Sequence, residues 1–568
     1  MRAVVLAALV AAAIAFVGLD DAPFLDPPEG FHAEVAREML VRGDFVTPRL
    51  NGVRYFDKPP VPYWLMSVSF QIAGPTPGAA RFWGALALVG VAAATAATGL
   101  LLRGPRFGFL AGLFAAANLG LFVYARIVKP DLLFVFVLSL AWLGVAIAWR
   151  VHPVGLVLFY AALGVAAITK DLLGALGPLA VLAIGLSWAG ERHLSRWFPW
   201  WGGAIVVAIA APWYLAVEAQ NRGFLWYTIV DNHLLNVTRQ RAFPDEDVPL
   251  RALEFLLVTV AALLPWILAT PLGVVRVFRE PAQTPEAGIW RVLTVWALAV
   301  IAVMTLSPFK LPHYGFPAFP ALALLAARAW DDAFDDPPRA RRVLVPATLL
   351  CALVAAAFGA VAFGVIPVGG ETLGIVDVAT RNLAARGQAA PAVPLAVWRP
   401  VLMSAAGVFA IAAVTLAVAS WQRIVGLGAA AAVGAMVAFL PVAGQGMAEF
   451  ARLRSPEPVI EALMLRGGAA EQVIHEGALE NSGSLLLALG RPVRVVNGLA
   501  SNLAYGATFA DSRDFFWDET RVQREWTAPG RRFLVSVVAP GRSIAGRLER
   551  AHLIARSGTH WLYSNLAD

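Results

Sequence analysis

The chain has 568 residues, of which 59% are hydrophobic and only 15% are charged. A water-soluble core of this size does not hold so large an apolar fraction, so the composition indicates a protein that lies in a bilayer. The net charge of +7 does not indicate nucleic-acid binding, because most arginines lie in short loops between apolar runs, where positive charge sets membrane topology.

The apolar residues form about thirteen stretches of spanning length, which predicts a polytopic α-helical membrane protein with about 13 transmembrane helices. The first stretch has an alternative interpretation as a cleaved signal peptide, because Arg2 precedes an Ala-rich run. The predicted spans lie at residues 3–19, 83–102, 107–124, 132–149, 154–168, 173–189, 200–217, 253–275, 288–306, 313–330, 342–366, 399–420 and 422–443.

Arginines in alternate loops predict the orientation. By the positive-inside rule their side is the cytoplasm, so the loops 20–82 and 218–252, the segment 367–398 and the tail are expected on the opposite side, which in a bacterial inner membrane is the periplasm. The acidic cluster 331–336 falls among the cytoplasmic loops and is interpreted as a solvated turn. The arginines that set this orientation are Arg2, Arg103, Arg106, Arg150, Arg192, Arg196, Arg276, Arg279, Arg339, Arg341, Arg342 and Arg423.

The first outer loop carries two candidate acids, Asp26 and Glu29. Phe31, Val35 and Met39 follow at helical spacing, which predicts a short amphipathic helix that lies at the membrane interface with Glu29 near its start. A carboxylate in that place can meet a lipid headgroup. The alternative is a helix cap or a solvated acid.

The same loop continues with Asp57 and Lys58 between aromatics and three prolines. A membrane-interface belt explains aromatics, but it does not require prolines that hold an acid-base pair in place. Lys58 can neutralise phosphate oxygens as a point charge. Candidate substrate-lining residues around this pair are Tyr55, Tyr63 and Trp64.

Three further outer loops place basic groups at span ends. Each group alone is explained by a side chain that snorkels to the interface. Together they lie on the side where the positive-inside rule disfavours them, which indicates a phosphate-ester or pyrophosphate-like ligand. A last loop, 221–233, adds aromatics and His233. The residues of the three loops are Arg126 with Asp131, Lys170, and Lys310 with His313 and Tyr314.

The tail changes composition at about residue 452, where charges return and short β-rich runs alternate with helix-like segments. This predicts a small soluble α/β domain. The predicted organisation is therefore a membrane domain over residues 1–443 and a periplasmic α/β domain over residues 444–568.

Three blocks in order resemble the bacterial lipid A aminoarabinose transferase family of GT-C glycosyltransferases, which is related to the protein O-mannosyltransferases. They are Glu29–Leu40, Tyr55–Pro60, and Phe309–Tyr314 with Phe316–Pro320. The resemblance implies the GT-C fold and a transferase that uses an undecaprenyl-phosphate-linked sugar as donor. It implies transfer with inversion to lipid A, another glycolipid or a protein at the membrane surface, by a chain that we expect to be a monomer.

The resemblance also implies roles for the candidate residues. Lys58 holds the carrier phosphate, and Asp131 is the second acid. Relatives read Asp-Glu where this chain has Pro28 and Glu29, so the first acid is either Glu29, which we favour, or Asp26. The helpers of Lys58 are Arg126, Lys170, Lys310 and His313, Tyr314 joins the substrate-lining set, and Asp57 with His233 matches a zinc site of some relatives.

Two other functions compete with this one. A transporter or flippase of a lipid-linked saccharide also needs cationic headgroup contacts, but it predicts ionisable groups near the middle of spans and broken helices in paired halves. The sequence keeps its charges at span ends. A non-catalytic envelope scaffold predicts that the outer-face acids are dispensable.

Overall fold

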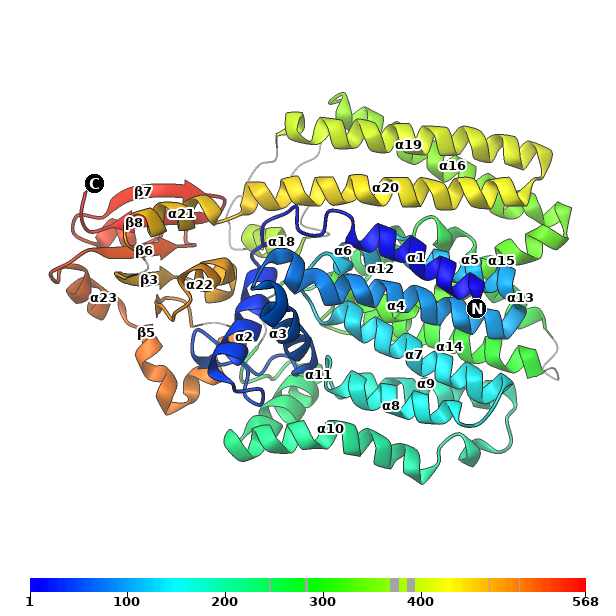
Figure 1. The fold of residues 1–568 in the computed structure, drawn as a ribbon, viewed down its shortest axis with the longest axis horizontal. Helices are drawn as coiled ribbons and strands as arrows, with labels where there is room; N and C mark the ends of the chain where they lie inside the picture. The colour runs from blue at the N-terminus through cyan, green and yellow to red at the C-terminus, as the bar shows by residue number, and fades with distance from the viewer. Residues whose placement is uncertain are drawn as a thin grey trace.

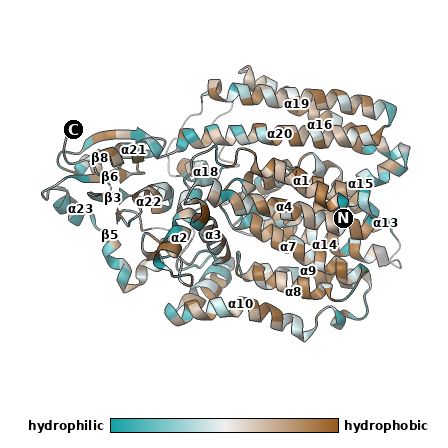
Figure 2. Ribbon diagram, in the orientation of Figure 1, coloured by the Kyte–Doolittle hydropathy of each residue, from teal (hydrophilic) through white to brown (hydrophobic). Residues whose placement is uncertain are grey.

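The computed structural model describes residues 1–244, 247–280, 285–367, 377–385, 394–468, 470–499 and 501–567. Long helices lie roughly parallel in a bundle, and an α/β unit caps one end of it (Figure 1). Hydrophobic residues follow the bundle helices, whereas hydrophilic residues gather on the α/β unit and at helix ends (Figure 2). Of the predicted outer segment 367–398, residues 368–376 and 386–393 lie outside the described residues, and the rest includes α18 (Val378–Ala385).

The bundle helices follow the predicted apolar stretches in order. They are α1 (Arg2–Phe16), α4 (Pro77–Arg103), α5 (Pro105–Ala116) with α6 (Leu119–Ala125), α7 (Asp131–Arg150), α8 (Gly155–Ala167), α9 (Leu173–Ala189), α10 (Trp200–Gln220), α12 (Ala252–Ala262) with α13 (Thr270–Arg279), α14 (Pro285–Leu306), α15 (Phe319–Asp335), α16 (Pro337–Ala362), α19 (Leu395–Gln422) and α20 (Val425–Arg454).

Within the described residues, seven helices are long and apolar enough to cross a membrane, and the number is nine if each bent pair forms one span. The pair α5 and α6 is bent by 62°, and α12 and the segment Trp266–Arg279 by 107°. Three shorter apolar helices, α1, α8 and Gly174–Ala189 of α9, lie among them. The chain is therefore a multi-pass helical membrane protein, and the count of thirteen spans stays a prediction.

The outer loop 20–82 is ordered around two helices, α2 (Glu29–Arg42) and α3 (Val61–Ala73), and the small antiparallel pair β1 (Arg49–Leu50) and β2 (Val53–Arg54). The amphipathic helix predicted after Glu29 is confirmed as α2. Its apolar side chains share a hydrophobic core with α3 and with the C-terminal sheet, so its apolar face packs on protein, and its location at the membrane interface stays a prediction.

The α/β unit is built on a six-stranded sheet in the order β5-β4-β3-β6-β8-β7. Strands β5, β4, β3 and β6 pair in parallel, and β8 and β7 pair antiparallel. Alternate residues of β3 and β6 enter two cores, one shared with α2 and one on the other face. The bounds are β3 (Gln472–Glu476), β4 (Arg494–Val496), β5 (Phe516–Trp517), β6 (Arg532–Ser536), β7 (His552–Ser557), β8 (His560–Ser564), α21 (Glu457–Leu465), α22 (Gly483–Leu489) and α23 (Glu519–Trp526).

The C-terminal unit packs directly on the outer loop. The Asn51 side-chain amide donates to the carbonyl of Val493 at 3.0 Å and accepts from its N–H at 2.7 Å. Gly30 of α2 meets Gly483 at the start of α22 so closely that a Cβ at Gly483 would stand 1.9 Å from the nitrogen of Phe31. The predicted boundary at residue 443 falls inside α20, which continues to Arg454.

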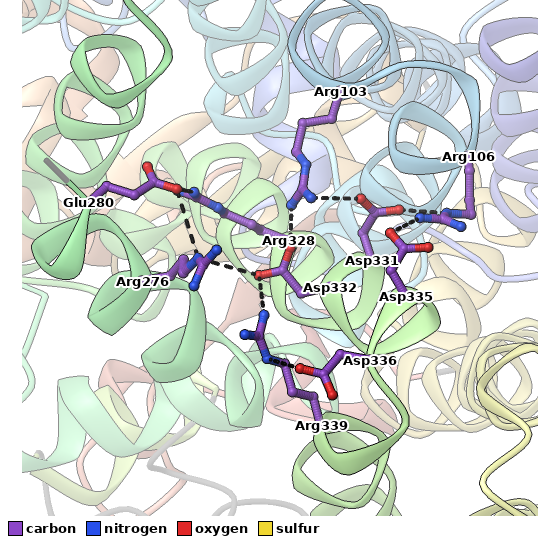
Figure 3. A network of polar contacts seen from close by, with 10 residues as sticks. All are labelled: Arg103, Arg106, Arg276, Glu280, Arg328, Asp331, Asp332, Asp335, Asp336 and Arg339. Carbon is purple, nitrogen blue, oxygen red and sulfur yellow. Dashed lines mark hydrogen bonds and ion pairs between the residues drawn. The ribbon is translucent and has the colours of Figure 1, made fainter. Parts of the chain in front are cut away.

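At the opposite end of the bundle, the acidic cluster 331–336 is not the freely solvated turn that its sequence suggests. Five acids and five arginines from α4, α5, α13, α15 and the start of α16 form one ion-pair network (Figure 3). Arg106, for example, contacts Asp331 at 2.7 Å and Asp335 at 2.8 Å. The cluster therefore ties neighbouring bundle helices together at this end.

Candidate functional site

Three span ends meet at a buried carboxylate. Asp131, the first residue of α7, is 4% exposed, and its Oδ1 lies 2.5 Å from the Lys170 ammonium and 3.4 Å from Nε2 of His313. Lys170 follows α8, and His313 lies in the 3-10 segment η4 (Pro312–Ala318) before α15. The Tyr124 hydroxyl stands 2.7 Å from Nδ1 of His313 and so fixes the orientation of that ring. The structure thus brings together residues that are far apart in the sequence.

The ammonium of Lys170 is held from more than one side. It lies 4.8 Å from the ring centre of Tyr314 and 5.5 Å from that of Phe134, in cation–π geometry. Its side chain is 16% exposed, so water still reaches it. A ligand anion can therefore approach Lys170 without first dismantling a closed core.

Lys58 forms an ion pair with its neighbour Asp57 at 2.5 Å, and the Tyr55 hydroxyl donates to the same carboxylate at 3.4 Å. Burial raises the pKa of Asp57, but the Lys58 ammonium outweighs it and holds that pKa below its ordinary value. Asp57 is therefore an anion at neutral pH, and it orients Lys58.

His32 links the Lys58 loop to the Asp131 cluster. Its Nδ1 lies 2.9 Å from the Tyr63 hydroxyl. Burial, with the positive charges of Lys58 and Lys129, lowers the pKa of His32 to about 3, so the ring is neutral at physiological pH. The fields of Lys58, Lys129 and Asp131 all reach this ring, which places the three groups around one region of the molecule.

The two candidates for the first acid are both engaged in structural contacts. Glu29 is 1% exposed and accepts from Nε and Nη2 of Arg81 at 2.8 and 2.6 Å and from the N–H of Val128 at 3.2 Å. Asp26 accepts the N–H of Gly30 at 3.1 Å and that of Ser484 at 2.9 Å. Burial raises the pKa of Asp26 to about 7. Asp26 therefore joins the starts of α2 and α22, and Glu29 joins α2, α4 and the loop before α7 rather than standing as a solvated acid.

The other predicted residues are the basic residues Arg126 and Lys310 and the aromatic residues. Arg126 donates to the carbonyls of Val17 and Gly18 and stacks on Phe122, so the structure does not bring its guanidinium to Asp131. Lys310 is 6% exposed, and its ammonium has no hydrogen bond or ion pair with any described residue. The aromatics are packed: Tyr55 and Tyr63 are buried edge to face, and the Trp64 indole donates to the carbonyl of Phe45 at 2.8 Å.

The architecture matches a solved structure over its whole length. ArnT from Cupriavidus metallidurans bound to undecaprenyl phosphate superimposes with a TM-score of 0.83 and 24% sequence identity, covering 100% of this chain and 98% of that chain. The same protein in the apo state gives 0.82. The chain has a GT-C fold.

Sequence comparisons agree. Residues 57–215 match the family described as dolichyl-phosphate-mannose-protein mannosyltransferase. The undecaprenyl phosphate-alpha-4-amino-4-deoxy-L-arabinose arabinosyl transferases of Serratia proteamaculans and Yersinia enterocolitica are 29% and 30% identical, over 58% and 59% of this chain. The matches span 59% and 61% of those relatives. The resemblance to aminoarabinose transferases is confirmed.

The predicted zinc ligands of this GT-C fold already have partners. Asp57 pairs with Lys58, and Nδ1 of His233 contacts the carbonyl of Thr228 at 2.5 Å. Among the residues that the structure describes, no group of three or more His, Cys, Asp or Glu side chains could hold a metal ion. The contact of His233 uses Nδ1 and leaves Nε2 of the ring available, so the zinc site stays a prediction, and the mechanism below uses no metal.

The sequence interpretation missed two cations of the GT-C site. Arg241 pairs with Asp231 at 3.3 Å, and its field reaches Asp57. Arginine is so common in this chain that nothing distinguishes Arg241 in the sequence. Lys129 is different, because only four of the 45 basic residues are lysines. The four are Lys58, Lys129, Lys170 and Lys310.

Proposed function

We propose that this chain is an integral-membrane glycosyltransferase that moves a sugar from undecaprenyl phosphate to an acceptor at the outer membrane face, with inversion at the anomeric carbon. The observation that carries the proposal is the convergence of Asp131, Lys170 and His313 beside the Lys58 loop, in a GT-C fold. The names of the curated relatives support 4-amino-4-deoxy-L-arabinose as the first sugar to test.

The donor half of the reaction needs positive charge. As the bond between the anomeric carbon and the phosphate oxygen breaks, that oxygen keeps the electron pair and the carrier leaves as a phosphate monoester. Lys58, oriented by Asp57, and Lys170, oriented by Asp131, are placed to stabilise this growing negative charge. Lys310 can add a third ammonium because no described residue neutralises it.

The acceptor oxygen attacks the anomeric carbon from the face opposite the phosphate. Asp131 is the only predicted catalytic acid that belongs to the cationic cluster, so we assign it the orientation of the acceptor and of Lys170. Glu29 acts as a positioning residue, since Arg81 and backbone N–H groups occupy its carboxylate. A phosphate acceptor needs no general base, whereas a hydroxyl acceptor loses its proton to Asp131. Lipid A, another glycolipid and a protein are all acceptors of these kinds.

The distribution of arginines supports a periplasmic site in a bacterial inner membrane. The ion-pair network of Figure 3 lies at the end of the bundle that carries these arginines, and the Asp131 cluster lies toward the other end, where α2 and the α/β unit pack. Donor and acceptor lipids would then meet at the outer leaflet.

The test is transfer by the purified full-length chain in nanodiscs with undecaprenyl-phosphate aminoarabinose and lipid A. We expect release of undecaprenyl phosphate and a sugar-bearing acceptor, lost in Lys58→Ala and Asp131→Asn and kept in the loop control Arg192→Gln. Mass spectrometry of envelope glycolipids and glycoproteins from cells lacking the chain identifies the natural acceptor. A flippase would move the intact donor across the bilayer without cleaving it, and that result would contradict the proposal.

A further inference from the structure

A small cleft lies beside the cluster around Asp131, between α2, α3, α4 and the loop 127–130, and it is partly open to solvent. His32, Tyr63, Arg81, Trp83 and Lys129 belong to its wall. The described residues that line it include neither Lys58 nor Lys170, so it is distinct from the place assigned to the carrier phosphate.

Lys129 is the cation in this wall that lacks a counterion. It is half-buried, and within the described part of the chain its ammonium has no hydrogen bond or ion pair. Its field nevertheless reaches His32 and Asp131. Asp131 is already paired with Lys170, and Asp57 with Lys58, so the ammonium of Lys129, like that of Lys310, has no carboxylate partner among the described residues.

The composition of the chain also singles out Lys129. Arginine occupies every basic position except four. Three of those four, Lys58, Lys170 and Lys310, are assigned to the proposed donor site, and Lys129 is the fourth. Lysine presents a compact point charge, whereas arginine presents a planar fork that pairs with carboxylates and fills surfaces. A lysine in a chain that otherwise uses arginine indicates that the small ammonium matters at this position.

The rest of the wall favours an anion. The described residues that line the cleft include no carboxylate. The indole N–H of Trp83 is buried and has no hydrogen-bond acceptor among the described residues. Arg81 is satisfied by Glu29, and neutral His32 contacts Tyr63, so these two shape the wall while Lys129 and Trp83 remain available to bind.

The helices that form the cleft expose large apolar side chains. Val68 and Ile72 of α3 are 47% and 83% exposed, and Phe82 and Leu86 of α4 are 38% and 40% exposed. On α4, a bundle helix, such surface faces lipid tails in a membrane protein, and α3 packs beside α4. A ligand that joins a hydrocarbon chain to a negatively charged headgroup matches both the apolar flanks and the cationic wall.

We infer that this cleft is a second anion site, which takes the phosphate of a lipid that approaches between α3 and α4, with Lys129 as its principal contact and Trp83 as a hydrogen-bond donor. The inference rests on the proposed function, because a transferase must bind an acceptor as well as the carrier lipid. The shared chemistry is a lipid phosphate, and its source is either the acceptor or a phospholipid of the bilayer.

Calorimetric titration of the full chain in phosphatidylcholine nanodiscs with dodecyl phosphate tests the site. We expect two binding sites, of which Lys129→Gln loses one and Lys58→Gln loses the other, each with at least about tenfold weaker binding. Arg192→Gln, a charge-matched loop control, should keep both. Trp83→Phe weakens the same site as Lys129→Gln and serves as the second variant if the lysine variant does not fold. Unchanged stoichiometry and affinity in Lys129→Gln would overturn the inference.

Kinetics separate the two sources of the phosphate. If the site holds the acceptor, Lys129→Gln raises KM for the acceptor about tenfold with little change in kcat. If it holds a bilayer lipid, KM is unchanged and the variant loses phosphatidylglycerol that co-purifies with the parent chain. Two-site binding by a chain that transfers no sugar would refute the proposed function while leaving the anion site in place.

Discussion

The buried pair between Asp131 and Lys170 gives the sharpest test of the site. Asp131→Asn removes the carboxylate charge and leaves the Lys170 ammonium facing only a neutral amide, His313 and two aromatic rings. Removing one partner of a buried ion pair costs about 3–5 kcal/mol. The side chains are 5% and 16% exposed, so water screens Lys170 slightly and we expect a loss near the lower end, about 3 kcal/mol.

The double variant Asp131→Asn with Lys170→Met removes both charges. It should recover about 2 kcal/mol of the summed losses of the two single variants, because neither charge is then left unpaired. The assay is reversible unfolding in mixed micelles, followed by helical circular dichroism, for the parent, both single variants and the double variant. Strictly additive losses would refute the claim that these groups form one pair.

Sugar transfer measured in the same variants distinguishes a loss of catalysis from a loss of stability. The double variant should be the more stable of the defective proteins and still transfer no sugar, because it lacks both the carboxylate and the ammonium of the site. Transfer by the double variant at the parental rate would show that the pair only holds α7 and α8 together.

Three other perturbations follow from the contacts. Glu29→Gln leaves Arg81 without its counterion and should lower stability by about 3 kcal/mol, measured by unfolding in micelles. Burial gives Asp26 a folded pKa of about 7, above its ordinary value, so the folded chain keeps a proton that the unfolded chain loses. The free energy of unfolding should therefore fall as pH rises from about 4 to about 7. Asp26→Asn should remove the part of this pH dependence that Asp26 contributes. Asp331→Asn should destabilise the bundle more than Asp335→Asn, because their side chains are 5% and 63% exposed, and equal thermal shifts would contradict this ranking.

The second of these needs a control because Glu34 has a pKa that burial also raises to about 7. Glu34→Gln should therefore remove a similar part of the slope, and the two variants together should remove more than either alone. A slope that persists unchanged in both single variants would show that neither acid is protonated in the folded chain near neutrality.

The order of the helices could be predicted because each apolar stretch records its own span, a local property. The site residues could be predicted in part, because Asp131, Lys170 and His313 stand at span ends and Lys58 lies in an outer loop on the same side. The sequence does not show which acids are occupied by structural contacts and which remain available to a substrate. Arg81 lies at the end of the outer loop 20–82, just before the predicted span 83–102, and nothing in its neighbourhood predicts that it reaches back to Glu29 across 52 positions.

The same limit applies to the apolar face of α2. Its apolar stripe predicts burial, but burial against lipid and burial against protein give the same pattern. The close approach of Gly30 to Gly483 decides between them, and it joins segments more than 450 residues apart. Two glycines in a chain that has 49 carry no such information until the fold is known.

The ion-pair network at the other end bears on the orientation of the whole protein. Arg103, Arg106, Arg276 and Arg339 were used as topological signals, yet each is neutralised by acids of its own network (Figure 3). If the positive-inside rule counted net charge, these four arginines would carry little information about orientation. The rule counts basic residues instead, because acidic residues contribute weakly to orientation during insertion. Insertion also precedes the packing of α15 against α4 and α5, so the arginines act as free charges first and as structural partners afterwards. One set of side chains can therefore fix both the sidedness of the bundle and, later, the contacts that close it.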